Sequence, residues 1–275
     1  MSAAGLLPPE LLERYRALRQ AGVVPSPCRD AATVVLLRDS PVGPQVYLQR
    51  RVTAMAFAAG MHVFPGGSVD PADAEAHVRW AGPSAAQWAE VLGSSEPLAR
   101  ALVCAAVRET FEESGVLLAG PFEGELLADV STDDWEAERV ALEAREQSLS
   151  QLLDRRGLVL RTDLLRPLAH WITPEVEPKR FDTRFFLAQL PDGQVCRDVG
   201  GEADDRVWIR PQQALDQQLP MLPPTTAALR DLTGAEDVRA ALAAPRTIAA
   251  IMPVLVQRGD DGLALVLPDD PDYPA

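Results

Sequence analysis

Three glutamates stand close together in the segment RETFEESG, which covers residues 108–115. On a helix, Glu109, Glu112 and Glu113 fall within an arc of about 100°, so their carboxylates share one face. Like charges at i and i+4 destabilise a helix by about 0.2–0.5 kcal/mol per pair, and no basic residue follows in the next turn. We therefore expect a positive partner at this face. Mg²⁺ and Mn²⁺ prefer carboxylate oxygens, and either ion fits the pattern.

The alternative interpretation of these residues is a solvated acidic helix face, which needs no ligand. Two features of the neighbouring sequence favour the metal site. Gly66 and Gly67 follow a predicted strand, where they allow a backbone carbonyl to approach an ion closely. Gly115 allows the chain to turn sharply where the acidic face ends.

The composition indicates a globular, soluble protein with a core of ordinary size, because 47% of the 275 residues are hydrophobic and 24% are charged. The formal net charge of −14 disfavours binding to the phosphate backbone of long nucleic acids. Small phosphorylated ligands are compatible with this charge, because divalent cations can bridge them to carboxylates. We expect a small-molecule substrate and no nucleic-acid partner.

Three cysteines at wide spacing form no C-x-x-C pair, so the sequence indicates neither a disulfide framework nor a zinc site. This cysteine usage is typical of a reducing compartment. No apolar run approaches the roughly 18 residues of a membrane-spanning helix, and residues 1–16 carry charges where a signal peptide is apolar. We expect a cytoplasmic protein with no membrane partner.

Segments rich in β-branched and apolar residues predict the strands of a sheet. The first two strands are separated by the turn sequence SPVG and are expected to form a hairpin. The third runs into the pair Gly66-Gly67. The predicted strands cover 31–39, 44–51, 61–67, 165–173, 181–190 and 205–211, and segments 247–257 and 263–268 are expected to end the sheet.

Helices are predicted between and around these strands. The helix that carries the glutamates is expected to begin at Ser94 or Ser95 and to end at Gly115, with an apolar stripe along its length. A long helix is predicted over 131–157, because Trp135, Leu142 and Leu149 recur every seven residues. Shorter helices are expected over 8–21, around Trp80 and Trp88, and over 211–218, 223–234 and 235–244. The pattern favours the α/β class, as an α/β/α sandwich with a mixed sheet.

The same residues resemble the signature of the Nudix hydrolases, G-x5-E-x7-R-E-U-x-E-E-x-G-U, in which U is aliphatic. Gly67 opens the signature, and Asp73 stands at the position of its first glutamate. A longer stretch than the usual seven residues follows, so 74–95 is interpreted as an insert ahead of an intact helix. Thr110 takes a position where an aliphatic residue is usual. The second half of the signature is supplied by Arg108, Glu109, Glu112, Glu113, Gly115 and Val116.

The long insert and the segments VYLQRRVTAMAFAAGMHVFPGGSVDPAD and WITPEVEPKRFDTRFFLA resemble the Nudix subfamily that includes the peroxisomal acyl-coenzyme A diphosphatase. The similarity extends from Ala31 to Ala214. Arg50 and Arg51 precede F-P-G-G, as arginine-containing sequence does in the coenzyme A signature of other Nudix diphosphatases.

The resemblance implies a set of site residues. Glu109, Glu112, Glu113 and the carbonyl of Gly66 are expected to bind Mg²⁺ or Mn²⁺. Arg108 is expected to hydrogen-bond a glutamate of the same face. The general base is expected among the helix glutamates or at Glu202, for which a solvated loop acid is the alternative. Candidate substrate-binding residues are Arg50, Arg51, Lys179, Arg180, Phe181 and Arg184, with exposed charges or core packing as the alternatives.

The implied activity is metal-dependent hydrolysis of a diphosphate linkage. The favoured substrate is coenzyme A or an acyl-CoA, cleaved to (acyl-)phosphopantetheine and 3',5'-ADP. The alternatives are ADP-ribose, NADH or a dinucleoside polyphosphate as substrate, or a nucleotide-sensing module without catalysis. We further expect an N-terminal helical arm at 1–25, a Nudix domain at 26–275 with a helical insert at 131–157, and a homodimer.

Overall fold

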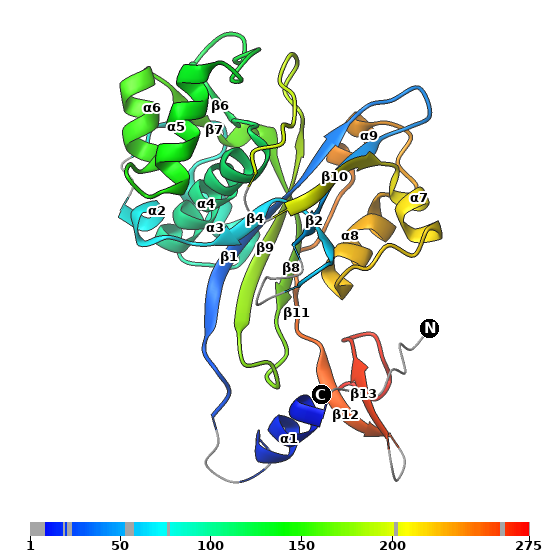
Figure 1. Cartoon of the computed structure of the whole chain (residues 1–275). Helices are drawn as coiled ribbons and strands as arrows, with labels where there is room; N and C mark the ends of the chain where they lie inside the picture. The colour runs from blue at the N-terminus through cyan, green and yellow to red at the C-terminus, as the bar shows by residue number, and fades with distance from the viewer. Residues whose placement is uncertain are drawn as a thin grey trace. The chain divides into compact units, whose positions relative to one another are not determined.

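The computed structural model describes residues 9–18, 20, 24–52, 58–75, 78–200, 203–258 and 262–274, and Figure 1 shows the elements along the chain. The chain divides into two compact units. The first comprises Met1–Asp30, His170–Thr183 and Ala249–Ala275. The second comprises Ala31–Ala169 and Arg184–Ile248, and it carries the three glutamates.

The predicted hairpin is confirmed. Strands β1 (Cys28–Arg38) and β2 (Gln45–Arg51) pair antiparallel, with Leu37 opposite Val46. Residues Val34 to Leu37 of β1 are fully buried, because helices cover both sides of the sheet in the second unit. Such burial explains why this strand is a continuous apolar run rather than an alternating one.

The strand predicted over 61–67 is wrong as a single element, because two short strands occupy it. Strand β3 (His62–Val63) pairs with β2, whereas β4 (Gly66–Ser68) pairs with β1. The chain changes partner around Pro65, which has no N–H to offer to a ladder. This change places the two glycines of β4 opposite Thr33 and Ala32.

The largest sheet has the strand order β10-β2-β1-β9-β8-β11, with β3 on β2 and β4 on β1. Two smaller sheets have the orders β5-β7-β6 and β12-β13. The remaining strands are β5 (Trp80–Ala81), β6 (Ala119–Gly120), β7 (Val159–Arg161), β8 (Leu165–Ile172), β9 (Arg180–Gln189), β10 (Ala203–Ile209), β11 (Ala250–Ile251), β12 (Val254–Arg258) and β13 (Gly262–Val266).

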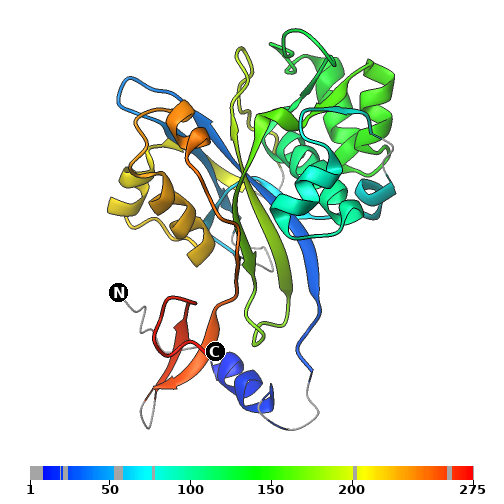
Figure 2. The same cartoon turned by 180° about the vertical axis from the view of Figure 1, so that it is seen from behind.

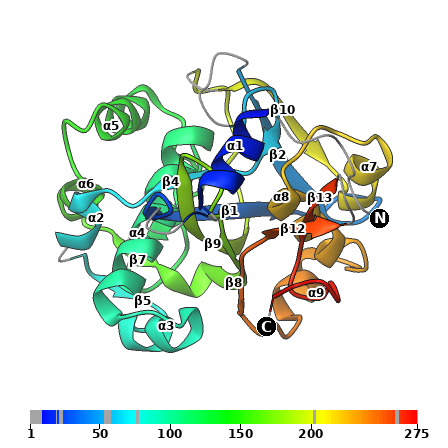
Figure 3. The same cartoon turned by 90° about the horizontal axis from the view of Figure 1, so that it is seen from below.

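The helices of the second unit lie on two sides of its strands, as the α/β/α expectation requires. Figures 1 and 3 show α2–α6 on one side and α7–α9 on the other, and Figure 2 shows the same division from behind. The described helices are α1 (Pro9–Leu18), α2 (Pro71–Glu75), α3 (Ala85–Leu92), α4 (Glu96–Ser114), α5 (Asp133–Glu143), α6 (Leu149–Arg156), α7 (Pro211–Asp216), α8 (Pro223–Leu232) and α9 (Val238–Ala243), with a 3-10 turn at Thr162–Leu164.

Helix α4 confirms the predicted helix and both of its ends. Ser95 is the N-cap, and its hydroxyl accepts from the backbone N–H of Leu98 at 3.4 Å. Gly115 ends the helix in the left-handed conformation at φ 71°. The predicted apolar stripe is too narrow, because every residue from Ala101 to Val107 is buried. The small side chains of this run allow α2, α3, α5 and β4 to pack around one helix.

The long helix predicted over 131–157 is wrong. Helix α5 ends at Glu143, and α6 begins at Leu149 after the N-cap Ser148. Ser148 and Gln151 form a reciprocal capping box, a start signal present in the sequence. The seven-residue spacing of apolar residues continues across the break because both helices bury their stripes against the same core.

Two further sequence predictions need correction. Trp80 lies in strand β5, parallel to β7, rather than in a helix, whereas Trp88 is helical as expected. The C-terminal segments do not both extend the main sheet. Only β11 joins it, parallel to β8, while β12 and β13 pair with each other. Pro253 interrupts the chain between β11 and β12, since it lacks an N–H for a ladder.

Among the described residues, no helix is long and apolar enough to cross a membrane.

Phe111 tests the packing that holds the glutamate-bearing helix. Its side chain is fully buried, and its ring meets Trp135 of α5 edge-on at a centroid distance of 6.4 Å. We expect Phe111→Ala to lower the free energy of unfolding by about 3–5 kcal/mol, because it leaves a cavity between two helices. Urea denaturation measures this change. The control Val91→Ala, on an exposed position of α3, should shift stability by less than about 0.5 kcal/mol. Equal shifts for the two variants would contradict the packing described.

Candidate active site

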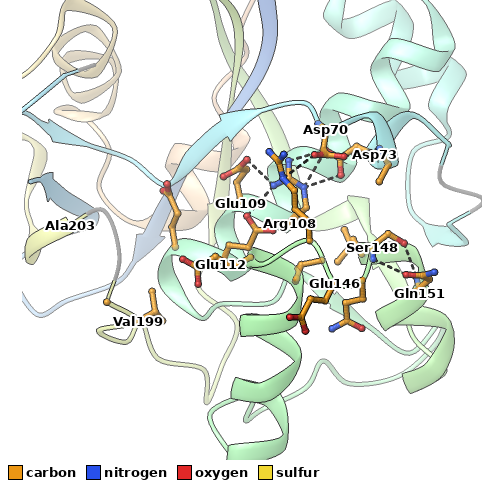
Figure 4. Close-up of a pocket in the computed structure, with 18 of the residues that line it drawn as sticks. Asp70, Asp73, Arg108, Glu109, Glu112, Glu146, Ser148, Gln151, Val199 and Ala203 are labelled. Atoms are coloured by element: carbon orange, nitrogen blue, oxygen red, sulfur yellow. Dashed lines mark hydrogen bonds and ion pairs between the residues drawn. The ribbon is translucent and has the colours of Figure 1, made fainter. Parts of the chain in front are cut away.

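Arg108 is the positive partner of the acidic face. Its guanidinium donates to Asp73 at 2.9 Å, to Glu109 at 2.8 Å and to Glu112 at 3.0 Å, and also to the carbonyl of Ser68 at 2.9 Å. Figure 4 shows these carboxylates gathered around the arginine. The turn after the glutamates contains no basic residue. The neutralising side chain instead precedes them, so part of the repulsion is relieved within the chain.

The acidic side chains still outnumber the cation. Three carboxylates contact one guanidinium. Burial and these contacts shift the pKa values of both Glu112 and Arg108. Burial, the largest cause, raises the pKa of Glu112, Arg108 opposes the shift, and Glu109 adds to it, so that the pKa is about 7. Burial alone would lower the pKa of Arg108, but its hydrogen bond to Asp73 and the nearby glutamates raise it. The face therefore retains a surplus of negative charge.

Glu113 is held by a different set of contacts. Gln49 of β2 donates its side-chain amide to Oε2 of Glu113 at 2.5 Å, and the backbone N–H of Gly66 donates to the same oxygen at 3.0 Å. Gln49 is only 3% exposed. The sequence analysis missed this residue, although one signal was present: a polar amide within the apolar strand segment VYLQ. A buried amide needs a partner, and here the partner is a glutamate of the acidic face.

Gly66 and Gly67 lie so close to neighbouring atoms that neither position has room for a Cβ, and neither adopts a left-handed backbone conformation. A Cβ on Gly67 would collide with the carboxylate of Glu109. A Cβ on Gly66 would come within 2.5 Å of the carbonyl oxygen of Ala32. Gly66 therefore allows β4 to lie close to the backbone of β1, and Gly67 leaves room for the carboxylate of Glu109 beside the strand.

Asp73 stands at the Nudix signature's first glutamate position and is almost fully buried. Its carboxylate contacts Nε of Arg108 at 3.1 and 3.2 Å and accepts from the backbone N–H of Asp70 at 2.8 Å. The shorter acid thus joins the loop before the insert to the arginine on α4.

Arg139 of helix α5 contacts the last turn of α4, which carries the acidic face. Arg139 is 2% exposed, and it donates to the backbone carbonyl of Glu112 and to the carboxylate of Glu143, both at 2.8 Å. It also pairs with Glu136, which in turn pairs with Arg197 at 2.8 Å. These contacts join the end of α4 to the helical insert.

A cavity of about 450 Å³ opens beside the acidic face, within the range of small-molecule sites. Figure 4 shows Glu109 and Glu112 on one wall, Glu146, Ser148 and Gln151 on another, and Val199 and Ala203 at a third position. The lining residues come from β2, the loop before α2, α2 itself, α4, the α5–α6 turn and the segment that leads into β10. The acids among them are Asp70, Asp73, Glu109, Glu112, Glu113, Glu143 and Glu146, and the cations are Arg108 and Arg145.

The predicted substrate-binding residues of the second unit lie outside this lining. Arg50 is on β2 and pairs with the exposed Asp204 at 2.8 Å. Arg51 is at the end of the same strand. Arg184 is 4% exposed, and its Nε lies 3.4 Å from the carbonyl of Leu92. Their roles toward a substrate stay predictions.

Two more of the predicted residues belong to the first unit. Arg180 is largely buried there and donates to the carbonyls of Thr173 at 3.0 Å and Ser26 at 2.9 Å. Phe181 lies beside Lys179, whose Nζ is 5.3 Å from the ring centroid. Glu202, the predicted loop base, lies outside the described residues.

The acidic face fits a divalent cation by charge and donor type. It presents carboxylate oxygens, which hard cations prefer, and three of its carboxylates share a single guanidinium. In the described part of the chain, no three His, Cys, Asp or Glu side chains are already arranged as metal ligands. Glu109 and Glu112 are turned toward Arg108 instead. Binding an ion there requires these carboxylates to reorient.

Comparison with known proteins defines the class of protein. Residues 81–227, just over half of the chain, match the NUDT19 Nudix domain. The chain belongs to this family of Nudix hydrolases, enzymes that act on diphosphate linkages and generally use divalent metal ions. The crystal structure of a Nudix hydrolase from Alicyclobacillus acidocaldarius is similar at 31% identity with a TM-score of 0.68, covering 81% of this chain and 98% of that one.

Two curated proteins are also similar to this chain in sequence. The acyl-coenzyme A diphosphatase NUDT19 of Gallus gallus is 26% identical over an alignment of 317 positions, gaps included, which spans 89% of this chain and 81% of the chicken protein. The putative nudix hydrolase 7 of Caenorhabditis elegans is 28% identical over 205 residues, which cover 71% of this chain and 56% of the nematode protein. The resemblance to a long-insert Nudix subfamily is thereby confirmed.

The glycine pair predicts two different outcomes for the same substitution. We expect Gly67→Ala to fold normally but to lose activity by about 100-fold, because the new methyl displaces only the end of the Glu109 side chain. Gly66→Ala should instead lower the melting temperature, since its methyl meets backbone. Thermal denaturation and a hydrolysis assay on both variants separate the effects. Full activity in Gly67→Ala would contradict the contact described.

The raised pKa of Glu112 predicts a pH-dependent stability in metal-free protein. Its folded pKa of about 7 lies above the ordinary 4.5, so the folded state holds the proton more tightly and stability falls as pH rises through this window. Relative to Glu112→Gln, the wild type should lose roughly 2–3 kcal/mol between pH 5 and pH 8, because one pKa unit corresponds to about 1.36 kcal/mol. Urea denaturation with EDTA measures both proteins. A difference independent of pH would argue against the shift.

Proposed function

We propose that the chain hydrolyses the diphosphate linkage of coenzyme A or of an acyl-CoA, releasing (acyl-)phosphopantetheine and 3',5'-ADP. The observation that carries the proposal is the acidic face of α4, which lines a cavity large enough for part of such a substrate. The chicken relative, whose name describes an acyl-coenzyme A diphosphatase, supports the choice of substrate.

Glu109, Glu112, Glu113 and the carbonyl of Gly66 are the groups that would hold Mg²⁺ or Mn²⁺. When bound, such an ion lowers the pKa of a water molecule and offsets the charge of the diphosphate. Arg108 orients Glu109 and Glu112, while Gln49 and the N–H of Gly66 hold Glu113 in place. These contacts keep the three carboxylates close together on one face, and Glu109 and Glu112 would turn from Arg108 toward the ion on binding.

The attacking water must pass a proton to a base as it bonds to phosphorus. We assign this role to a glutamate of the acidic face or to Glu202 in the segment before β10. The alternative of a nucleotide sensor without catalysis has less support, because Arg108 and the three glutamates are all present in a member of a hydrolase family.

The cytoplasmic location, the homodimer and the division into an arm at 1–25 and a domain at 26–275 stay predictions from the sequence. A single long helix at 131–157 would have offered a narrow apolar stripe to a second subunit. Because this segment folds as α5 and α6, the predicted homodimer now rests on the N-terminal arm and on the resemblance to the family.

A substrate panel tests the proposal. The purified chain is incubated with Mg²⁺ or Mn²⁺ and with coenzyme A, acetyl-CoA, ADP-ribose, NADH or diadenosine tetraphosphate, and the products are identified by mass spectrometry. We expect cleavage of coenzyme A and its ester to 3',5'-ADP at the highest kcat/KM. Preferential hydrolysis of ADP-ribose, NADH or the dinucleotide would assign the alternative substrate instead.

Glu113→Gln tests whether the acidic face performs this reaction. We expect kcat to fall by about 100-fold or more with unchanged folding, because the amide keeps the shape of the side chain but loses a charged oxygen ligand. The matched control is Glu90→Gln, an exposed glutamate on α3, which should keep wild-type activity. Wild-type turnover in Glu113→Gln would rule out its role as a metal ligand.

A further inference from the structure

Helix α5 ends beside the cavity at a left-handed residue that is not glycine, as α7 does at Gln218. The backbone N–H of Arg145 bonds to the carbonyl of Leu142 at 2.9 Å, and that of Glu146 bonds to the carbonyl of Ala141 at 2.8 Å. These bonds close the helix around a left-handed residue, Arg145, at φ 59°. Glycine is the usual residue here, because a Cβ is unfavourable in this conformation. Helices α3, α4 and α6 also end at a left-handed residue, and in each of them that residue is a glycine: Gly93, Gly115 and Gly157.

The strained residue is also a cation in an acidic cavity. Among the described lining residues, seven are acids and two are arginines. Arg108 contacts three carboxylates and a carbonyl and is nearly buried. Arg145 is different, because its side chain is 83% exposed and its ion pair with Asp70 is long, at 3.4 Å. An exposed pair of this length contributes little to stability. The cost of the left-handed arginine is therefore not offset by the contacts it makes within the protein.

We propose that Arg145 binds a phosphate group of the substrate that lies outside the cleaved diphosphate. This inference rests on the proposed function, under which that group is the 3'-phosphate of coenzyme A. The acidic face attracts only a cation, so an extra phosphate in the same cavity needs a positive side chain. A guanidinium donates in a fork that matches phosphate oxygens. Backbone strain at a binding site is expected where the strained residue presents a functional group.

The backbone strain provides the first test. Arg145→Gly removes both the side chain and the strain, so we expect an equal or higher melting temperature together with a raised KM for coenzyme A. The matched control is Gln218→Gly. Gln218 follows α7 in the left-handed conformation at φ 51°, and it does not line the cavity. This control should gain stability similarly and keep the wild-type KM. A KM that is unchanged in Arg145→Gly would overturn the proposal.

Substrate selectivity provides the second test. Coenzyme A and dephospho-coenzyme A differ only in the 3'-phosphate, so the ratio of their kcat/KM values reports its recognition. We expect Arg145→Ala to lower this ratio by about 10- to 100-fold, as loss of one charge-assisted contact predicts, and Arg145→Lys to restore part of it. Equal losses for both substrates would show that Arg145 contacts a shared part of the molecule, and the proposal would fail.

A binding measurement separates this inference from the proposed function. Isothermal titration calorimetry compares adenosine 3',5'-bisphosphate with adenosine 5'-monophosphate, on wild type and on Arg145→Ala. If coenzyme A is not hydrolysed but the bisphosphate binds more tightly through Arg145, the proposed substrate is wrong and the phosphate site stands. If coenzyme A is hydrolysed but the two nucleotides bind equally, or their difference persists in Arg145→Ala, the phosphate site is wrong and the proposed function stands.

Discussion

A single buried guanidinium organises the acidic face. Arg108 draws Asp73, Glu109 and Glu112 toward one point, where its guanidinium pairs with all three carboxylates. Its contacts with Asp73 and with the carbonyl of Ser68 reach across the insert at 74–95. The insert can therefore be long without separating the two halves of the signature. What joins them is an ion pair in space rather than a short stretch of chain.

The helical insert contacts the acidic face through α5 and lines the cavity through the turn between α5 and α6. Arg139 on α5 holds the carbonyl of Glu112 and the carboxylate of Glu143, so the last turn of α4 is fixed from the side opposite β4. The turn between α5 and α6 then supplies a wall of the cavity. The same short segment thus contacts the acidic face and lines the cavity.

Close packing sets the residue types around the acidic face. Helix α4 is buried on all sides from Ala101 to Val107, which favours small side chains. In β4, Gly66 leaves room for the backbone of β1, and Gly67 leaves room for the carboxylate of Glu109. The side chains at these positions carry no chemistry of their own. They bring a sheet edge and a helix close enough for Gln49 and the N–H of Gly66 to reach Glu113.

The sequence by itself determined the hairpin, helix α4 with both caps, the α/β/α class and the set of charged residues on α4, because these depend on local spacing and on capping residues. Only the tertiary structure decided the break at Arg145 and the change of partner at Pro65. It also decided the burial of Gln49 and the pairing of Arg108 with Asp73. These features depend on contacts between segments distant in sequence, where the energy of packing and of buried charge outweighs local preference.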